Sequence, residues 1–478
     1  MQSNKPDNNQ KTADGRQSAD PARRAAFQVL QAVFEHQAYA NLSSLQALSG
    51  PELSAQDRAF ASAMIYGTIS RVFSIDWLIS QCSSREIKSL DQTVRTLLRM
   101  GVWQLYWSGS VPDSAAVNES VKLAHHLNKT SAAGYVNAVL RQISRERLAL
   151  PDNKPPVLYS LPPELYGYLK KWYADEAPLL AKAFLDEKKT ISVRVNRCRT
   201  SPEKLGIQLQ EKGMNVLPGQ YCEEALQLEL SGRAVSQLDA WQQGLLTVQD
   251  EAAMLAVCAA DPQPGQRVID LCAAPGGKTA HLFEKAKGNI ELLAFDKNQQ
   301  RLDLMQKNLA LLGHQGINCR LGDATGTGMD PALIGSADLV LLDAPCSGLG
   351  LLARKPELRL TMTHEKMIQL YPLQAAMLDY AASLVKPGGC LIYSTCTMNP
   401  AENLEAVNAF CQRSPFSFEK TSISALLPDK LLAHDDLRRQ AADGWVQLLP
   451  HRHNVDGFFI ARLRRNAQVS ADMHGMNA

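Results

Sequence analysis

The first third of the chain carries apolar residues at the three- and four-residue spacing of amphipathic helices, with almost no strand-like alternation. The clearest apolar stripes are AAFQVLQAVFEH (25–36), DRAFASAMIYGTISRVFSIDWLI (57–79), TVRTLLRMGVWQLYW (93–107) and AAVNESVKLAHHL (115–127). Turn-forming Ser, Gly and Pro residues separate these stretches. The pattern predicts an all-α helical bundle over residues 21–150, with Trp103, Tyr106 and Trp107 in its core.

A proline-rich break, LPDNKPP (150–156), ends this region. Beyond it, a helical stretch, PPELYGYLKKWYA (162–174), is followed by a strand-like stretch, TISVRVNRC (190–198). A further strand-like stretch, LLTVQD, covers residues 245–250. Residues 151–245 are therefore predicted to form a small α+β connecting domain.

Short apolar strands alternate with amphipathic helices over residues 246–465. The predicted strands are RVIDL (267–271), ELLAF (291–295), INCRL (317–321), DLVLL (338–342) and CLIYS (390–394), and GFFIARLRR (457–465) adds one more. This alternation predicts βαβ units and a parallel, doubly wound sheet in an α/β, Rossmann-like domain. The polar ends, residues 1–20 and 466–478, are expected to be disordered.

Composition narrows the class of protein. With 478 residues the chain is too long for one core, and its 45% hydrophobic and 21% charged residues are ordinary for a globular protein. No apolar run is long enough to span a membrane, and the first twenty residues lack the apolar segment of a secretory signal. The net charge of +2 neither demands nor excludes a nucleic-acid partner.

The ten cysteines are scattered, without a C-x-x-C pair. We therefore expect free thiols in a cytoplasmic protein. His125-His126 and His451-x-His453 are too isolated to predict a metal site. The expectation is a protein with neither a metal nor a membrane as partner.

A turn of small residues follows the first strand of the Rossmann-like domain. It reads Cys272-Ala273-Ala274-Pro275-Gly276-Gly277-Lys278 and leads directly into a helix. In doubly wound sheets ligands bind outside the carboxyl ends of the strands, where small residues allow a ligand to approach the backbone. A P-loop would need glycine at position 272, and G-x-G-x-x-G is absent, so a phosphate cradle is not predicted.

Acidic residues end the strands that follow: Asp296, Asp323 and Asp343. An acid at such a position accepts hydrogen bonds from ribose hydroxyls. Each alone is an ordinary solvated side chain, but three at successive strand ends after a small-residue turn predict a rim that binds a nucleoside. Without a phosphate cradle, S-adenosyl-L-methionine fits this rim better than a dinucleotide.

Two predicted strands end in cysteines, Cys346 in DAPC and Cys396 in STCT. Methylation of cytosine at C5 needs a thiolate that adds to C6, an acid near N3, and a group that promotes elimination. Strand ends and helix starts can lower a thiol pKa as this chemistry requires, and Asn399-Pro400 is expected to open a helix just beyond Cys396. The residues alone do not decide which sulfur attacks.

The motifs CAAPGGK (272–278), LLDAPCSGLG (341–350), STCT (394–397) and DGFFIARL (456–463) resemble those of RNA cytosine-C5 methyltransferases. The helical N-terminus resembles the RNA-binding domain of the antitermination factor NusB. Together, over residues 21–465, the chain is similar to the bacterial 16S ribosomal RNA methyltransferases of the Sun/Fmu type. The resemblance implies a class I methyltransferase domain and 16S ribosomal RNA, free or in a small-subunit precursor, as substrate.

The resemblance also implies roles for single residues. Cys396 corresponds to the family's nucleophile, Cys346 to the cysteine that assists release of the methylated base, and Asp343 lies beside it. The 272–278 turn, Asp296, Asp323 and Asp343 correspond to the S-adenosylmethionine contacts. DNA cytosine-C5 methyltransferases, in contrast, use the P-C cysteine as nucleophile.

Two alternatives to a 16S-specific enzyme stay open: a catalytically silent assembly factor that binds ribosomal RNA, and a methyltransferase acting on another RNA such as tRNA. An N4-type methyltransferase is excluded because DAPC stands where that class has D/N-P-P-[YF]. A monomer is expected. Arginines of the bundle are candidate RNA contacts, and the loop Lys355–Leu358 is expected to meet RNA. These arginines are Arg23, Arg24, Arg141, Arg145 and Arg147.

Overall fold

The computed structural model describes residues 19–467, except residues 37, 39, 49, 51, 187–189, 231 and 232. The expected disordered ends lie almost entirely outside the described residues. The chain divides into two compact units. Among the described residues, the helical unit contains those up to 186, residue 233 and residues 352–361; the sheet unit contains residues 190–230, 234–351 and 362–467.

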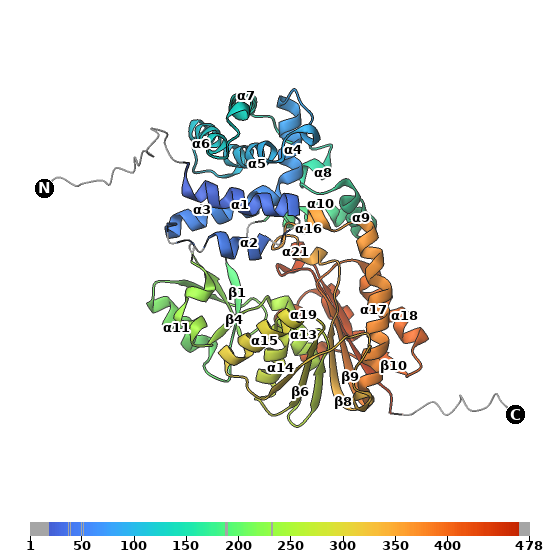
Figure 1. The fold of residues 1–478 in the computed structure, drawn as a ribbon. Helices are drawn as coiled ribbons and strands as arrows, with labels where there is room; N and C mark the ends of the chain where they lie inside the picture. The colour runs from blue at the N-terminus through green and yellow to red at the C-terminus, as the bar shows by residue number, and fades with distance from the viewer. Residues whose placement is uncertain are drawn as a thin grey trace. The chain divides into compact units, whose positions relative to one another are not determined.

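The helical unit is built from the amphipathic stretches of the first third of the chain (Figure 1). Their apolar stripes meet in one core that includes Leu30, Ile65, Leu98 and Val136, and Trp103 is 3% exposed there. The helices are α1 Pro21–His36, α2 Ala40–Ala47, α3 Ala55–Ser70, α4 Val72–Cys82, α5 Gln92–Trp107, α6 Asp113–His126, α7 Thr130–Glu146, α8 Pro155–Leu158, α9 Pro163–Tyr173 and α10 Ala177–Ala183.

The stripe over residues 57–79 forms two helices, α3 and α4, although its sequence pattern is continuous. The break lies at Arg71, whose backbone angles are φ −110° and ψ 15°. Beyond the break, the amide of Phe73 donates to Ser160 Oγ at 3.1 Å, and Ser74 Oγ donates to the carbonyl of Val157 at 2.6 Å. In a continuous helix the amide of Phe73 would donate to a carbonyl of the preceding turn. Here the side chain of Ser160 accepts from it instead.

The sheet unit begins with a small antiparallel sheet in the order β2-β3-β1-β4. Its strands are β1 Ile191–Val195, β2 Asn215–Pro218, β3 Ala225–Glu229 and β4 Leu246–Val248, with helix α11 Pro202–Glu211 beside them. The strands predicted within residues 190–198 and 245–250 are therefore present, next to each other in the sheet.

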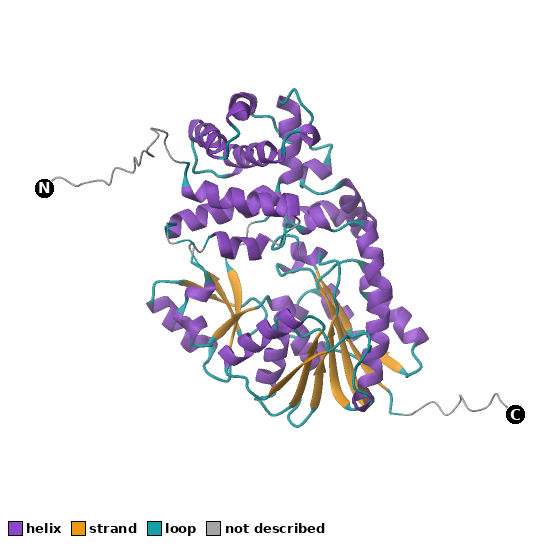
Figure 2. Ribbon diagram, viewed as in Figure 1, coloured by secondary structure: helices purple, strands orange, loops and turns teal. Residues whose placement is uncertain are grey.

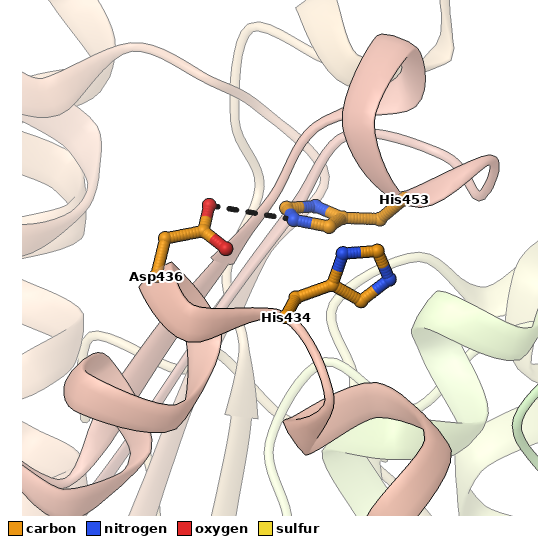
Figure 3. Close-up of side chains that lie close together, drawn as sticks. All are labelled: His434, Asp436 and His453. Carbon is orange, nitrogen blue, oxygen red and sulfur yellow. Dashed lines mark ion pairs between the residues drawn. The ribbon is translucent and has the colours of Figure 1, made fainter.

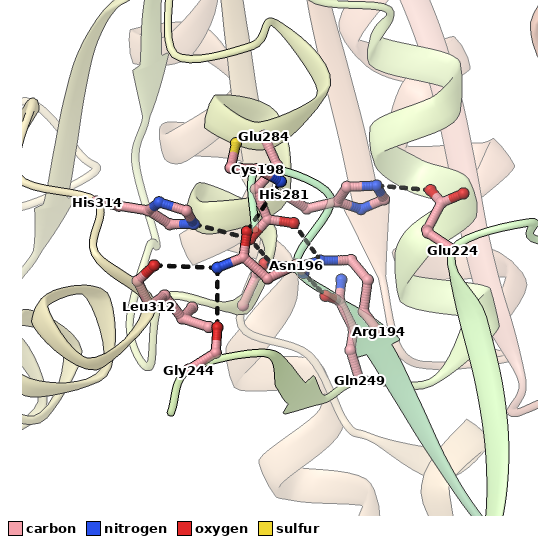
Figure 4. Close-up of polar contacts among 11 residues, drawn as sticks. Arg194, Asn196, Cys198, Glu224, Gly244, Gln249, His281, Glu284, Leu312 and His314 are labelled. Carbon is pink, nitrogen blue, oxygen red and sulfur yellow. Dashed lines mark hydrogen bonds and ion pairs between the residues drawn. The ribbon is translucent and has the colours of Figure 1, made fainter. Parts of the chain in front are cut away.

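Buried polar side chains join this small sheet to the large one (Figure 4). Arg194 on β1, fully buried, donates from Nη2 to Glu284 Oε1 at 2.9 Å and from Nε to Glu284 Oε2 at 3.1 Å. Glu284 also contacts His314 Nε2 at 2.8 Å, and His281 Nε2 lies 2.8 Å from Glu224 Oε1. The two sheets are thus held together by a buried, largely paired network.

The large sheet has the order β10-β12-β9-β8-β5-β6-β7, and β11 pairs with β12. Figure 2 shows its strands with helices packed beside them. The strands are β5 Arg267–Asp270, β6 Glu291–Asp296, β7 Ile317–Leu321, β8 Ala337–Asp343, β9 Val385–Thr395, β10 Phe418–Lys420, β11 Trp445–Leu448 and β12 Phe458–Arg465. The main helices are α13 Glu251–Ala260, α14 Gly277–Lys285, α15 Gln299–Leu312, α17 His364–Leu384 and α18 Leu404–Arg413.

Alternate residues of the central strand β8 point to different cores. Leu339 and Leu341 belong to the core that contains residues of α13 and α14, whereas Val340 and Leu342 belong to the core that contains residues of α17. A strand buried on both faces reads as a continuous apolar run, as LVLL does here. The sheet is therefore covered by helices on both faces, as the doubly wound prediction requires.

The five strands β7, β6, β5, β8 and β9 are parallel, and their order confirms the predicted doubly wound centre. The sheet as a whole is mixed, because the strand predicted at 457–465 joins β9 antiparallel. The carboxyl ends of β5, β8 and β9 meet where the chain order changes direction, which is where such sheets bind ligands. Among the described helices, none is long and apolar enough to cross a membrane.

Candidate active site

The two predicted cysteines come together at this edge of the sheet. Strands β8 and β9 run parallel in a register that places Asp343 beside Ser394. Cys346 lies shortly after the end of β8 and Cys396 directly follows β9, and Cys346 Sγ lies 3.2 Å from Cys396 Sγ. Both cysteines are half-buried. At this distance the two sulfur atoms can share one proton.

Lys278 brings a positive charge to the cysteines. Its Nζ lies 2.7 Å from Asp343 Oδ2, and Ser394 Oγ donates to the other oxygen of Asp343 at 2.7 Å. Burial alone would lower the pKa of Lys278, but the carboxylate of Asp343 and the negative charge that Cys396 can carry raise it overall. Lys278 is therefore a cation at neutral pH, placed to stabilise a thiolate at Cys396.

The two thiols interact electrostatically. The hydrogen bond between Cys346 and Cys396 raises the pKa of the Cys346 thiol, and burial and the charges of Cys396 and Glu402 raise it further. Because the two sulfur atoms share this hydrogen bond, they titrate as a pair.

The helix expected to open at Asn399-Pro400 begins later. Pro400–Glu402 form a short 3₁₀ turn, and α18 starts only at Leu404. Cys396 is therefore not at a helix N-terminus. The side chain of Asn399 accepts a hydrogen bond from the amide of Ala401, and such a local hydrogen bond competes with an earlier start of the helix. Lys278 takes the place of the expected helix dipole as the source of positive potential.

The small-residue turn is held close to its neighbours. The amide of Ala273 donates to the carbonyl of Phe295 at 2.9 Å, and Asn308 Nδ2 donates to the carbonyl of Pro275 at 3.0 Å. Gly276 has a φ of +99°, in the region that glycine adopts without strain, and α14 begins at the next residue. Burial raises the pKa of Cys272, so this thiol stays neutral.

Asp270, the last residue of β5, was missed by the sequence reasoning. It is 1% exposed, and Thr279 Oγ1 donates to its Oδ2 at 2.8 Å. Its Oδ1 is buried and has no hydrogen-bond partner, and burial raises the pKa of Asp270 to about 7. It ends its strand as Asp296, Asp323 and Asp343 do, so the same criterion could have identified it.

The other acids follow neighbouring strands. Asp296 ends β6, is 3% exposed, and accepts from the amide of Asn298 at 3.0 Å. Asp323 follows β7 and accepts from the amide and the hydroxyl of Thr325, both at 2.8 Å. Hydrogen bonds from Thr325 lower the pKa of Asp323. Asp270, Asp296 and Asp323 thus follow the adjacent strands β5, β6 and β7 in order.

These residues fit S-adenosylmethionine. The unpaired oxygen of Asp270 suits a donor such as an ammonium group, and carboxylates at the strand ends suit ribose hydroxyls and a cationic ligand. A turn without bulky side chains lets such a ligand lie against the backbone.

His434, Asp436 and His453 form a separate group outside this edge, with ligand-type atoms within 4.8 Å of one another (Figure 3). His453 Nδ1 accepts from the amide of Leu449 at 2.9 Å, so the ring proton belongs on Nε2, which faces Asp436 at 3.5 Å. A metal on Nε2 would have to displace that proton and leave the ring without one. Arg452 Nη1 already lies 2.7 Å from Asp436 Oδ2. The expected absence of a metal stays a prediction.

Among the expected RNA contacts, Arg23 is buried and paired, whereas contact by the loop Lys355–Leu358 stays a prediction. Arg23 is 9% exposed; its Nε donates to Gln104 Oε1 at 2.8 Å and its guanidinium lies over Phe60. It is held in the core of the helical unit. In the loop Lys355–Leu358, Glu357 is 2% exposed, so only Lys355 of its charged residues can reach a partner. Arg147 is paired with Asp113 at 2.6 Å, and Arg141 Nε contacts Asn137.

A doubly wound sheet with a small-residue turn, carboxylates at strand ends and a thiol pair at one edge defines an S-adenosylmethionine-dependent methyltransferase. Comparison with known proteins agrees. Residues 255–464 match the family described as 16S rRNA methyltransferase RsmB/F. Residues 20–145 match the NusB family, and residues 162–235 match the ferredoxin-like domain of RsmF/B-like methyltransferases.

Similar proteins extend over nearly the whole chain. The probable ribosomal RNA small subunit methyltransferases B of Synechocystis and Bacillus subtilis are 33% and 32% identical, covering 93% of this chain and 99% and 98% of theirs. A solved structure named PH0851 is 26% identical with a TM-score of 0.79, covering 94% of this chain and 100% of its own. The chain belongs to the RsmB/F family of RNA methyltransferases, and its cofactor is S-adenosylmethionine.

Proposed function

We propose that this protein methylates C5 of a cytosine in 16S ribosomal RNA. The observation that carries the proposal is the thiol pair, with Cys346 and Cys396 3.2 Å apart. N- and O-methyl transfer need no such pair, whereas methylation at C5 of cytosine needs a thiolate and a group that reverses its addition. The names of the Synechocystis and Bacillus subtilis relatives point to small-subunit ribosomal RNA as substrate.

Cys396 is the nucleophile in this proposal. Its thiolate, opposite Lys278, forms a bond to C6 of the cytosine, which makes C5 electron-rich. When bound, S-adenosylmethionine supplies an electrophilic methyl group on a positively charged sulfur. Asp343 pairs with Lys278 and accepts a hydrogen bond from the Ser394 hydroxyl. It thereby fixes the positive charge of Lys278 beside the attacking sulfur. In this proposal Asp343 also orients the base.

Cys346 completes the reaction. While Cys396 is a thiolate, its charge and its hydrogen bond keep the proton on Cys346. Once Cys396 is bonded to C6, both effects disappear, Cys346 becomes more acidic and it releases its proton to solvent. The resulting thiolate of Cys346 acts as the base that takes the C5 proton, after which the bond between C6 and Cys396 breaks and Cys396 leaves as a thiolate. The pair therefore exchanges roles in the order that the chemistry requires.

The remaining parts follow from this assignment. The turn Cys272–Lys278 and the acids Asp296, Asp323 and Asp343 hold the cofactor, with Asp270 added. The helical domain, residues 21–150, binds RNA. Residues 151–245 connect it to the catalytic domain, residues 246–465, which carries out methyl transfer. The protein acts as a cytoplasmic monomer without a metal. Arg24, Arg141 and Arg145 remain candidates for phosphate contacts.

Bisulfite sequencing of 16S RNA from cells with and without this gene tests the proposal. We expect one 5-methylcytosine to disappear in the deletion strain and to return with the wild-type gene. A Cys396→Ser gene should not restore it. Unchanged 16S RNA with a lost 5-methylcytosine in tRNA would move the substrate to tRNA. No loss in any RNA would favour a silent assembly factor and would refute the proposal.

A further inference from the structure

A buried carboxylate lies behind both cysteine-bearing loops. Glu402, in the 3₁₀ turn after β9, has no exposed surface. Its Oε2 accepts from the amide of Ser347 at 2.8 Å and from Gln374 Nε2 at 3.0 Å. Its Oε1 accepts from Ser347 Oγ at 2.5 Å and from Asn399 Nδ2 at 3.0 Å. All four donors are neutral groups.

Ser347 and Asn399 belong to the two loops that carry the thiols, and Gln374 belongs to helix α17. Ser347 directly follows Cys346, and its hydroxyl lies 2.7 Å from the hydroxyl of Thr397, which directly follows Cys396. Gln374 also donates to the carbonyl of Pro345, on the other side of Cys346, at 2.9 Å. The carboxylate of Glu402 is therefore a common acceptor for both loops and for helix α17.

A fully buried carboxylate with only neutral donors is unusual, because charged side chains are almost never fully buried unless they are paired. Hydrogen bonds to a charged group are about twice as strong as neutral ones. Such an acceptor therefore holds its donors more firmly than an amide could, although its burial costs folding free energy. We attribute the presence of this costly buried carboxylate to the firm hold that it gives on the loops of the active site.

We propose that Glu402 is a positioning residue: through Ser347, Asn399 and Gln374 it holds Cys346 and Cys396 at the separation that lets them share one proton. Its negative charge adds to the effects of Cys396 and of burial that raise the pKa of the Cys346 thiol. Loss of the charge should therefore loosen the pair and make Cys346 more acidic. The consequence for catalysis rests on the proposed function, but the effect on the thiols does not.

The test compares Glu402→Gln with a matched control, Glu251→Gln. Glu251 is also buried, at 1% exposure, and accepts from the amides of Gln220, Tyr221 and Cys222 at 2.9, 2.7 and 2.9 Å. It braces a backbone segment without a catalytic thiol. Both variants lose a buried carboxylate, so a general loss of stability affects both.

The first measurement is the rate at which diamide forms the Cys346–Cys396 disulfide in the full-length protein, followed by peptide mass mapping. Diamide takes up the two electrons and two protons that the thiols lose. We expect Glu402→Gln to slow this reaction about tenfold or more, because the rate depends on the effective concentration of one thiol at the other. Glu251→Gln should react at the wild-type rate. Equal rates in all three proteins would overturn the proposal.

The second measurement is the pH dependence of iodoacetamide labelling at Cys346. Its midpoint should move to lower pH in Glu402→Gln and stay in place in Glu251→Gln; an unmoved midpoint in Glu402→Gln counts against the proposal. If Glu402→Gln does not fold, Ser347→Ala removes the hydroxyl donor and keeps the carboxylate, and it should still slow the disulfide. Absence of RNA methylation in the wild type would refute the proposed function and leave both thiol measurements valid.

Discussion

The backbones of Gly350 and Gly457 lie in direct contact. The amide of Gly457 donates to the carbonyl of Gly350 at 3.0 Å, and the amide of Gly350 donates to the carbonyl of Cys396 at 3.1 Å. A Cβ at Gly457 would lie 2.7 Å from Cα of Gly350, closer than real Cβ atoms approach. The loop after Cys346 is thereby fixed against the start of β12 and the peptide of Cys396.

Gly457→Ala should therefore move the Cys346 loop away from Cys396. Because a displacement of about 1 Å at a reacting group can cost about a hundredfold in rate, we expect a loss of that order in methyl transfer. Gly206→Ala is the control, since a Cβ there meets no atom within 4 Å. Incorporation of labelled methyl groups into RNA measures the effect. Wild-type activity in Gly457→Ala would show that this contact does not position the loop.

The proposed division of roles between the thiols predicts opposite phenotypes. Cys396→Ser should abolish methyl transfer and leave cofactor binding intact, because the nucleophile is lost. Cys346→Ala should instead accumulate a covalent protein–RNA complex, because the adduct forms but is not resolved. A slowly migrating band on a denaturing gel detects it. Cys411→Ser, at a thiol outside the pair, should behave as wild type. Activity in Cys396→Ser would reverse the roles.

The positive charge of Lys278 predicts that its removal shifts the pH dependence of methyl transfer. A cation near an acid lowers its pKa, so removing the charge in Lys278→Met should raise the pKa of the Cys396 thiol. A nearby opposite charge changes a pKa by about 1–3 units, which implies at least a tenfold loss of single-turnover rate at pH 7. The rising limb of the pH–rate profile should move to higher pH. Lys278→Arg should restore its position in part, and Lys386→Met, at a surface ion pair, should leave it unchanged.

Strand-end reasoning located the site because parallel strands bring their carboxyl ends to one edge whatever the loops do. This is why Asp343, Cys346 and Cys396 could be grouped from the sequence alone. Glu402 could not be found in this way, because its role depends on donors from three separate segments. The break at Arg71 was missed for a similar reason, since Ser160, far along the chain, supplies the competing acceptor.

The same contrast between local sequence and tertiary structure applies to a buried acid and to the start of a helix. Asp270 ends its strand as the predicted acids do, but its depth and its unpaired oxygen are visible only in the structure. The start of α18 was placed too early because Asn399-Pro400 has a helix-opening sequence, whereas the local hydrogen bonds form a 3₁₀ turn. Local propensity does not include these tertiary or side-chain competitors.

The raised pKa of Asp270 predicts that the stability of the folded protein depends on pH. Its pKa is about 7 in the folded protein against an ordinary value of 3.8. Between these values the folded state binds more protons than the unfolded state, so stability falls as pH rises from about 4 to about 7. At about 1.4 kcal/mol for each pKa unit, the loss is about 4 kcal/mol. Asp270→Asn should remove this contribution, so urea unfolding at pH 5 and pH 8 should show a smaller pH effect. Identical pH effects would contradict it.

Arg194 and Glu284 predict coupling between the small sheet and the cofactor turn. Arg194 pairs with Glu284 and also donates to the carbonyl of Gly277 at 2.7 Å, at the end of the turn. Removing one partner of a buried pair leaves an uncompensated charge, so Arg194→Met should lower the free energy of unfolding by about 3–5 kcal/mol. It should also weaken cofactor binding, because the Gly277 carbonyl loses its donor.

The double variant Arg194→Met, Glu284→Gln separates these two effects. It leaves no unpaired charge, so most of the lost stability should return, while the donor to Gly277 stays absent and cofactor binding stays weak. Urea unfolding and calorimetric titration with S-adenosylmethionine measure the two quantities independently. Arg413→Met, at an exposed ion pair, should change neither. Full recovery of cofactor affinity in the double variant would mean that Arg194 acts only by neutralising Glu284; continued weakness would show that the small sheet holds the turn directly.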